Sequence, residues 1–500
     1  MRASDKCIAL GLVGLAGFLL LTRLDQPLLW QDEAQTALLA RSIFEFGVPV
    51  GFDAVNSYSQ ELGVEYGPDG RWRWHPWLPF YLVAASFATL GTDTASARIP
   101  FALCGLATVL LAWAAGRDLF RDRFGAAAGA LLLCVSLSFV VLSRQARYYA
   151  LAALLSLVGL WIGAHLRAGK TKPTLALVAT ATLLFYTQAV YAASLLLAIL
   201  LHAAWLHRAA LRPALLAAIA TGSLAAPWIA WVGTTSDAAG MARFLAWRDT
   251  PLQLVHYGNM LFDPVFASGA LLVAPLALFL LRVGRGTPVL EAPAPRHAAL
   301  LALYVAVTIL LLGLLSPLPY LRYLAPILPP IFLLVGMSLG ALYRAHRALA
   351  VFCLAVALVF GSLDELADEY RDRPPGPIAG IVSFLGNQAA PGDRVAIAYG
   401  DLPVKFYTGL RTIGGLSGEP LDEVAEARWL IPRRHAPAAR SREVNRALRR
   451  ALHGGTFRRH VLPVPDRAFE NREDPRLRSR RAAADGPRVV IWERTEVTTP

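Results

Sequence analysis

Eleven apolar runs, each close to the length that crosses a bilayer, restrict what this sequence can fold into. A spanning helix needs roughly 17–25 mainly apolar residues. The runs cover about residues 7–22, 98–116, 124–142, 149–166, 174–189, 190–206, 213–232, 267–282, 298–316, 324–343 and 347–362. With 56% hydrophobic and 17% charged residues and a mean hydropathy of +0.47, the chain is too apolar for an ordinary soluble protein. The sequence therefore predicts an α-helical polytopic membrane protein with about 11 spanning helices.

Positive charge in the connecting loops predicts the orientation. Arg2 and Lys6 precede the first run, which places the N-terminus in the cytoplasm and the next loop outside. Five later loops carry the basic residues expected on the cytoplasmic side: Arg117, Arg121, Arg123, Arg167, Lys170, Lys172, Arg208, Arg212, Arg282, Arg285, Arg296, Arg344 and Arg347. All five lie there only if a shorter run with two prolines, about 76–91, does not cross. We therefore expect 76–91 to be a re-entrant or interfacial piece of a first outer loop, about 23–97.

The net charge of +13 has a topological explanation. Because much of it lies in short loops between apolar runs, it fits membrane topology and lipid head groups better than nucleic acid.

The cysteines lie in or beside apolar runs without a CxxC pair and indicate neither disulfides nor a zinc site: Cys7, Cys104, Cys134 and Cys353. The basic N-terminus resembles a signal peptide, but the many later spans favour an uncleaved first helix.

The composition changes after about residue 362, where charge, proline and arginine increase and no further apolar run follows. "DRVAIAYG" (393–400), "RWLIP" (428–432) and "RVVIWER" (488–494) are typical of strands, and helical segments alternate with them. We expect a membrane domain, 1–362, and a small α/β domain outside the membrane, 363–500. The arginines between 440 and 481 either face an anionic lipid or acceptor or form a solvated basic surface.

Two adjacent carboxylates, Asp32 and Glu33, stand where the chain leaves the first run. Asp32 occupies a favourable helix N-cap position, Gln35 follows as in a variant capping box, and Gly47 ends the helix. Its apolar side predicts that Glu33–Phe46 is an amphipathic helix at the outer interface. Local sequence leaves two interpretations open: the carboxylates stabilise the start of this helix, or they perform chemistry.

Further polar residues are predicted on the same outer side. His75 lies in "RWRWHPW", while "SRQARYYAL" (143–151) and "PLPYLRYLAP" (317–326) lie at the outer ends of two spans. Positive-inside topology disfavours arginines there unless something anionic holds them, and a lipid head group explains each one alone. Together with the carboxylates they suggest a cavity that binds a phosphate and activates a hydroxyl. Its candidate phosphate ligands are His75, Arg144, Arg147, Tyr148, Arg322 and Tyr323.

These segments resemble the GT-C fold glycosyltransferases that use polyprenyl-phosphate sugars, especially the protein mannosyltransferase and aminoarabinose transferase branches. The resemblance covers most of the chain and rests on "QDEAQTALLARSIFEFG", "HPWLPFYLVAASFATLG", "SRQARYYAL", "RYLAPILPP" and "VKFYTGLR". It implies that Asp32 is the catalytic carboxylate and Glu33 its acidic neighbour. The aminoarabinose branch has a lysine at His75, an arginine at Gln35 and a glutamate at Trp74, and its second carboxylate has no clear match after "RQARYY". These differences argue against an aminoarabinose donor and leave the sugar open.

The resemblance implies an inverting transfer of a sugar from polyprenyl phosphate to an acceptor outside the bacterial inner membrane. Asp32 would be the base, Glu33 would orient substrate or share that role, and Arg147, Arg322 and His75 would stabilise the departing phosphate. No metal-ligand cluster is evident, and we expect no metal or other cofactor. The acceptor is a glycan, a lipid or a protein.

A lipid or glycolipid transporter, such as a flippase, is the main alternative function, with polar residues lining a path through the whole membrane. An assembly or anchoring protein is the other; it would leave Asp32, Arg147 and Arg322 scattered.

Overall fold

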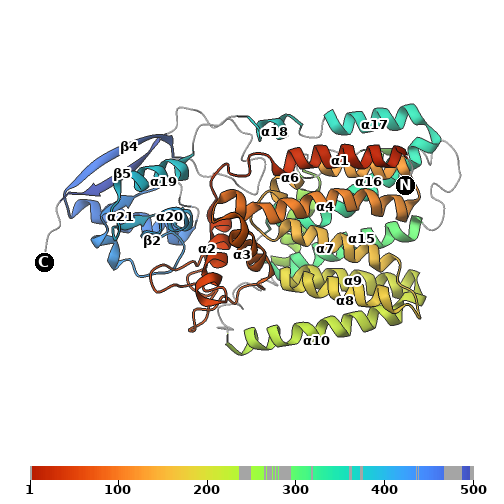
Figure 1. Cartoon of the computed structure of the whole chain (residues 1–500), viewed down its shortest axis with the longest axis horizontal. Helices are drawn as coiled ribbons and strands as arrows, with labels where there is room; N and C mark the ends of the chain where they lie inside the picture. Colours follow the sequence, from red (N-terminus) through yellow and green to blue (C-terminus); the bar gives the residue numbers. More distant parts are fainter. Residues whose placement is uncertain are drawn as a thin grey trace.

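A helix bundle and a smaller domain with a sheet make up the computed structural model, which describes residues 3–235, 249–263, 294–316, 319–359, 363–371, 376–434, 438–466 and 487–495 and single positions between them (Figure 1). Most helices lie side by side in the bundle: α1 (Ala3–Leu21), α4 (Thr94–Phe120), α5 (Arg123–Cys134), α6 (Leu137–Ser143), α7 (Tyr149–Ala164), α8 (Thr171–Thr187), α9 (Ala189–Leu206), η1 (Arg208–Ala210), α10 (Leu211–Thr235), α12 (Thr250–Leu261), α15 (Ala294–Leu315), η3 (Leu321–Ile327), α16 (Leu328–Ala345) and α17 (Arg347–Val359).

The described apolar runs form helices close to their predicted bounds. Among the described residues, five helices are long and apolar enough to cross a membrane, and six when the bent pair α5 and α6 counts as one. Shorter apolar helices, including α7 and α17, occupy other predicted runs. The run 267–282 lies outside the described residues apart from single positions. The chain is therefore a mostly helical membrane protein, while the number of eleven crossings stays a prediction.

Two predicted spans differ in detail from single straight helices. The run 124–142 is bent by 62° between α5 and α6, because the Ser136 side chain accepts a hydrogen bond from the Phe139 N–H and starts a new helix. The run 324–343 begins as a 3₁₀ helix, since the prolines from Pro326 to Pro330 lack the N–H groups of a regular helix start.

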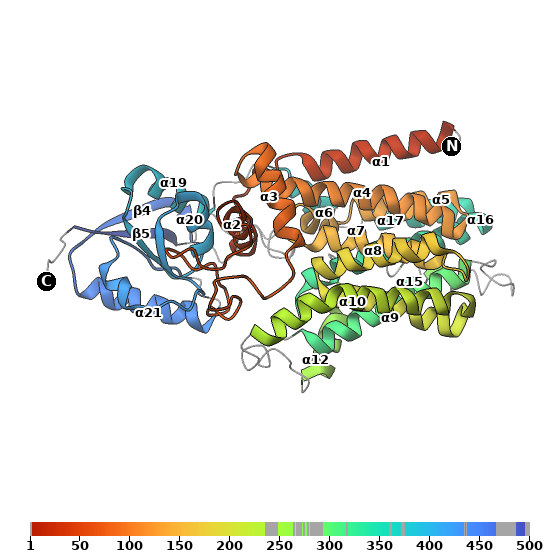
Figure 2. The ribbon, with the colours of Figure 1, turned by 60° about the horizontal axis from the view of Figure 1, so that its bottom comes forward.

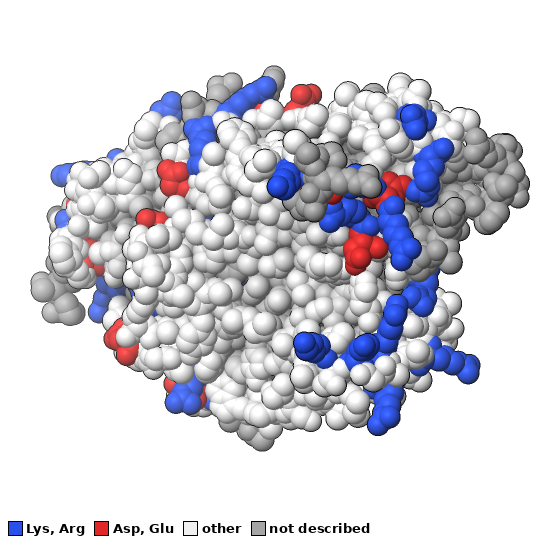
Figure 3. All heavy atoms as spheres, turned by 45° about the vertical axis from the view of Figure 1, so that its right-hand side comes forward, with Lys and Arg blue, Asp and Glu red and all other residues white. Residues whose placement is uncertain are grey.

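The described basic loops meet at one end of the bundle. Asp5 at the start of α1 pairs with Arg117 and Arg123, and Asp122 in the same loop pairs with Arg344. Figure 3 shows Lys and Arg along one side of this end, next to a broad surface without charge. This gathering is the pattern that the charge argument requires of loops on one side of a membrane.

Two helices of the loop that the sequence predicts to be the first outer one, α2 (Gln31–Phe46) and α3 (Leu78–Leu90), lie at the opposite end, between the bundle and the C-terminal domain. In Figures 1 and 2 both run across the direction of the bundle helices. Side chains of α2 and α3 share one apolar core with residues of α4 and of the C-terminal domain. The segment 76–91 thus forms a short helix at the end of the bundle.

The C-terminal domain holds a five-stranded sheet in the order β2-β1-β3-β5-β4. Strands β2, β1 and β3 are parallel, and β5 is antiparallel to both β3 and β4. Val395 and Ile397 face one apolar core, and Ala396 and Ala398 face the other, as alternation along a strand requires. Its elements are α19 (Pro377–Gln388), β1 (Arg394–Ile397), α20 (Asp401–Thr408), β2 (Arg411–Gly414), η4 (Asp422–Glu426), β3 (Trp429–Ile431), α21 (Ala439–His453), β4 (Phe457–Pro465) and β5 (Arg488–Arg494). The helix before them, α18 (Leu363–Asp368), packs on the bundle instead, where Leu366 joins the bundle core.

Three of these strands, β1, β3 and β5, lie at the predicted positions. The other two, β2 and β4, are absent from the prediction, because they are short or carry polar residues on their exposed side. The predicted mixture of strands and helices in the tail is confirmed.

Candidate active site

Helix α2 begins at Gln31, before the start that the sequence predicts. Trp30 is its N-cap residue, makes no capping hydrogen bond, and leaves Asp32 at the second position inside the helix. The Gln35 amide donates instead to the Tyr58 carbonyl, at 2.9 Å, and to the Glu65 carboxylate, at 3.2 Å. The predicted cap at Asp32 and the capping box are therefore wrong, whereas the predicted end at Gly47, with a φ of 71°, is confirmed.

The environment of α2 also corrects the prediction of an amphipathic interfacial helix. Every residue from Gln31 to Ala40 is buried, on all sides of the helix. The helix packs against α3 on one side and against α20 of the C-terminal domain on another (Figure 1). Because α2 lies between two parts of the protein, its polar side chains meet other side chains where the prediction placed head groups.

Asp32 lies between two arginines from distant segments. Its Oδ2 is 3.5 Å from Arg322 Nη2, and only 8% of the residue is exposed. Arg147 Nη1 donates to the Asp32 carbonyl oxygen at 3.3 Å and to Thr36 Oγ1, one turn later, at 3.2 Å. The first turn of α2 thus joins the loop before α7 to the segment before α16.

Aromatic rings enclose both guanidinium groups. The Arg322 guanidinium lies 4.0 Å from the centre of the Tyr320 ring, 5.5 Å from that of Tyr323 and 5.8 Å from that of Trp30. The Arg147 guanidinium lies 5.7 Å from the centre of the Tyr148 ring. Rings attract the cations and exclude water, so charge interactions in this space are stronger than at an open surface.

His75 lies beside Tyr148, with the two ring centres 6.2 Å apart. Burial, and then the positive charge of Arg147, lowers the pKa of His75 from 6.5 to about 3. The side chain is therefore neutral at physiological pH, which corrects its predicted role as a cation. As a neutral ring it can still form a hydrogen bond to a ligand through Nε2, which has no hydrogen-bond partner among the described residues.

Several other buried polar atoms near Asp32 have no hydrogen-bond partner among the described residues: Trp30 Nε1, Arg147 Nε and the Tyr149 hydroxyl. Tyr149 is close enough to Asp32 and both arginines for their charges to act on it. Buried polar groups nearly always have partners in folded proteins. A gathering of such donors around two arginines and a carboxylate therefore indicates a site built for a polar, anionic ligand.

Glu33 has a different environment from Asp32. Arg98 donates to both of its carboxylate oxygens, at 2.8 and 2.7 Å, and the Ala146 N–H donates to Oε1 at 2.8 Å. Glu33 is completely buried. Its oxygens hold α2 against α4 and the loop before α7, which favours a structural role; that Glu33 orients substrate or shares the catalytic role stays a prediction.

Arg144 is also separate from the site. Its guanidinium donates to the carbonyls of Leu19 and Arg23 and to the Tyr370 hydroxyl, and lies 5.2 Å from the centre of the Tyr370 ring. It therefore ties the end of α1 to the segment after α18. Of the eight predicted site residues, the structure gathers Asp32, His75, Arg147, Tyr148, Arg322 and Tyr323, and gives Glu33 and Arg144 structural contacts.

The sequence argument missed Arg98, Trp30, Thr36 and Tyr149. Arg98 could have been found by the rule that selected the others, since it too is an arginine at the predicted outer end of a span. The other three carry no sequence signal for a site. Among the described residues, no group of three His, Cys, Asp or Glu side chains is placed to hold a metal ion.

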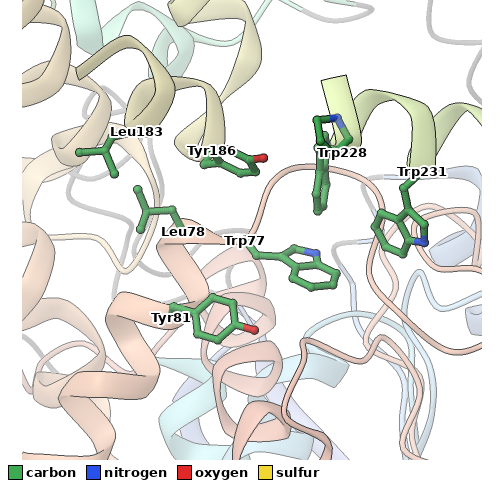
Figure 4. Close-up of a pocket in the computed structure, with 8 residues that line it drawn as sticks. Trp77, Leu78, Tyr81, Leu183, Tyr186, Trp228 and Trp231 are labelled. Carbon is green, nitrogen blue, oxygen red and sulfur yellow. The ribbon is translucent and has the colours of Figure 1, made fainter. Parts of the chain in front are cut away.

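An apolar pocket of about 530 Å³ opens beside the site (Figure 4). Its walls come from α3 and the residue before it, α8 and α10: Trp77, Leu78, Tyr81, Leu183, Tyr186, Pro227, Trp228 and Trp231. Trp77 Nε1 donates to the Trp72 carbonyl and the Tyr186 hydroxyl to the Leu224 carbonyl, so both polar atoms are already used. The Trp72 ring in turn lies 5.8 Å from that of His75, which connects the pocket wall to the site.

Comparison with known proteins agrees with the fold. Residues 74–231 match the family model of dolichyl-phosphate-mannose-protein mannosyltransferases. No curated protein sequence gave a significant match.

Two solved structures resemble the whole arrangement. ArnT from Cupriavidus metallidurans bound to undecaprenyl phosphate has a TM-score of 0.60 and 15% identity, and the match covers 100% of both chains. The oligosaccharyltransferase AglB from Archaeoglobus fulgidus, in complex with an inhibitory peptide and a dolichol-phosphate, has a TM-score of 0.54 and 11% identity, over 86% of this chain and 70% of that one. The chain therefore has the GT-C fold of these glycosyltransferases, and the family match supports the predicted transferase class.

Proposed function

We propose that this protein is an inverting glycosyltransferase that moves a sugar from a polyprenyl-phosphate donor to an acceptor on the outer face of the bacterial inner membrane. The observation that carries the proposal is the buried Asp32 carboxylate, 3.5 Å from Arg322, with Arg147 hydrogen-bonded to the Asp32 carbonyl oxygen. A base and two phosphate-binding cations are the groups that this transfer needs.

The chemistry assigns each group a step. Asp32 accepts the proton of the acceptor hydroxyl as the oxygen attacks the anomeric carbon, and the bond to the phosphate oxygen breaks on the opposite side. The leaving phosphate gains negative charge, which the guanidinium groups of Arg147 and Arg322 stabilise. The Tyr148 hydroxyl can donate to the same phosphate. Neutral His75 uses its N–H at Nδ1 for the Pro76 carbonyl, so its free Nε2 can only accept a hydrogen bond, as from a substrate hydroxyl. One displacement inverts the anomeric centre.

The apolar pocket supports a lipid-linked donor. Its walls present ring faces and alkyl groups, which suit a hydrocarbon chain better than a sugar (Figure 4). The wall residue Trp77 donates to the Trp72 carbonyl, and the Trp72 ring lies 5.8 Å from that of His75, so the pocket wall is linked to the site by two contacts. ArnT was solved with undecaprenyl phosphate and AglB with a dolichol-phosphate, two lipids of this class.

The location of the site supports an acceptor on the outer face. The basic loops gather at one end of the bundle, and α2 and the C-terminal domain lie at the other (Figures 1 and 3). Positive-inside topology then puts the N-terminus in the cytoplasm and the site and residues 363–500 outside. Membrane lipids surround the bundle, and a glycan, lipid or protein acceptor enters from the outer side.

The transporter alternative has no comparable support. A transporter needs polar groups along a path through the whole membrane. Among the described residues, Asp32, Arg147, Arg322 and His75 gather at one end of the bundle instead.

Mass spectrometry of envelope glycolipids and glycoproteins tests the proposal. Cells that express the wild-type protein, Asp32→Asn at equal amount, or no protein are compared. We expect a sugar modification that only the wild type produces, and purified protein should then transfer that sugar from its polyprenyl phosphate with inversion, read by NMR of the product. A modification that Asp32→Asn produces equally well, or lipid translocation by both variants without any transfer, contradicts the proposal.

A further inference from the structure

Helix α20 of the C-terminal domain reaches into the first outer loop with three polar side chains. Asp401 Oδ1 accepts a hydrogen bond from the Gln31 amide at 2.8 Å, in the turn of α2 that carries Asp32. Lys405 Nζ pairs with Asp401 Oδ2 at 3.0 Å and donates to the Ser57 carbonyl at 2.7 Å. The side chains of Asp401 and Lys405 are both 0% exposed.

A third contact holds the other side of Trp30. The Tyr407 hydroxyl accepts a hydrogen bond from the Leu29 N–H at 2.9 Å and lies 2.6 Å from Thr94 Oγ1 at the start of α4. Residues 29 and 31, which flank the N-cap of α2, are thus both bonded to α20. The start of α2 is therefore bonded to a helix far along the chain, with Asp401 370 positions after Gln31.

Stable packing of α20 against the loop does not require these polar contacts. A buried ion pair adds little stability compared with apolar side chains of similar volume. The same interface also contains an apolar contact, the stacked rings of Phe406 and Phe87 with centres 6.3 Å apart. What the polar contacts add is direction, because hydrogen bonds and ion pairs fix angles that apolar contacts leave loose.

The surrounding loop is shaped around Asp401. Gly415 has a φ of +57°, and a Cβ atom there would lie 1.8 Å from Asp401 Oδ1. Lys405 Nζ also lies 3.9 Å from Glu419 Oε2, so the pair is part of a larger buried polar network. The Asp401 carboxylate thus fills the space that a side chain at position 415 would need.

We infer that α20 positions the proposed catalytic carboxylate: Asp401, through Gln31, and Tyr407, through the Leu29 N–H, hold the first turn of α2 so that Asp32 faces Arg322. The inference rests on the proposed function of Asp32. Asp401, Lys405 and Tyr407 are positioning residues, since they touch the helix and the loop and not the reacting atoms. The C-terminal domain thereby takes part in building the site.

Tyr407→Phe tests this with little risk to folding, because it removes one hydroxyl and keeps the ring. Misplacing a reacting group by about 1 Å can cost on the order of 10²-fold, so we expect kcat to fall by about tenfold with the donor KM unchanged. Tyr304→Phe is the matched control, since it removes a buried hydroxyl bonded to Ser156 Oγ within the bundle. It should lose a similar amount of thermal stability and keep wild-type kcat.

The double variant with Asp32→Asn separates positioning from other effects. If Tyr407 acts through Asp32, adding Tyr407→Phe to Asp32→Asn lowers the remaining activity no further. A kcat of Tyr407→Phe equal to that of Tyr304→Phe, or a full additional loss in the double variant, overturns the inference. Failure of the proposed function has another signature, wild-type turnover by Asp32→Asn itself.

A second double variant removes the ion pair without leaving a lone buried charge. Asp401→Leu with Lys405→Met keeps the volume and removes both charges, so the thermal unfolding temperature should fall only by the loss of the hydrogen bonds to Gln31 and Ser57. We expect kcat to fall as in Tyr407→Phe and the donor KM to stay the same. Wild-type kcat in this folded double variant also overturns the inference.

Discussion

The two sides of the first turn of α2 hold the same pair of groups, a carboxylate and an arginine, in opposite states. Glu33 receives two hydrogen bonds from Arg98 and one from a backbone N–H, all between 2.7 and 2.8 Å. Asp32 faces Arg322 at 3.5 Å, and nearby polar atoms of Trp30, His75, Arg147 and Tyr149 have no hydrogen-bond partner in the described part of the chain. Full satisfaction marks a structural pair, and incomplete satisfaction marks a place where a ligand completes the contacts.

The largest expected effect is that of Asp32→Asn on turnover. It keeps the size of the side chain and removes the base, so transfer should fall by roughly 10²–10⁴-fold. Asp32 does not cap α2, but its charge faces Arg322, so some thermal stability should be lost and turnover is compared per amount of folded protein. Asp69→Asn, a change at a partly exposed carboxylate in the same outer loop, is the control and should transfer normally. Normal turnover by Asp32→Asn would contradict the catalytic role of Asp32 and, with it, the difference proposed between Asp32 and Glu33.

Arg98→Met should act on stability instead. It leaves the buried Glu33 charge without its partner, which costs about 3–5 kcal/mol of the free energy of unfolding. Adding Glu33→Gln removes that charge but keeps an acceptor for the Ala146 N–H, so most of the stability should return. Thermal unfolding in detergent measures both variants. Wild-type stability of Arg98→Met alone would show that the Glu33 pair is not structural.

Substitutions of Arg147 and Arg322 sharpen the comparison at the ligand side. Lysine keeps the charge but loses the planar fork, so each Arg→Lys change should weaken transfer about tenfold, and each Arg→Ala change by about 10²–10³-fold. Arg144→Lys is the matched control, because Arg144 contacts backbone carbonyls and Tyr370. It should change stability and leave donor affinity intact. Equal donor affinity in all of these variants would mean that the arginines bind surrounding lipid and no donor.

The smallest effect concerns the pH dependence of stability through His75. Its pKa is lowered to about 3 by burial and then by Arg147, so the unfolded chain takes up the proton first as the pH falls below 6.5. The stability that neutral His75 contributes is thus complete above 6.5 and decreases by about 1.4 kcal/mol per pH unit below it. His75→Gln should flatten this part of the unfolding curve. An unchanged slope between about pH 6.5 and 5.5 would place a charged histidine in the site.

Much of the fold was predictable because hydropathy and turn residues act locally. The described apolar runs form helices, Gly47 ends α2, and α8 and α9 break at Gln188. The topology argument likewise selected Asp32, Arg147 and Arg322, which the structure brings together. The same argument selected Arg144 and passed over Arg98. It uses only the position of a cation at a helix end and contains no information about the groups that the cation contacts.

By itself, the sequence determined that the chain is a helical membrane protein with its basic loops at one end and its acidic pair at the other. These are sums over neighbouring residues, and each segment carries its own information. Only the tertiary structure decided which carboxylate is satisfied, that His75 is neutral, and that α20 holds the start of α2. Those outcomes depend on partners 65 or 370 positions away, and on a burial that no single segment specifies. Hydrogen bonding and pKa follow from such contacts, so the chemistry at Asp32 is a property of the folded chain.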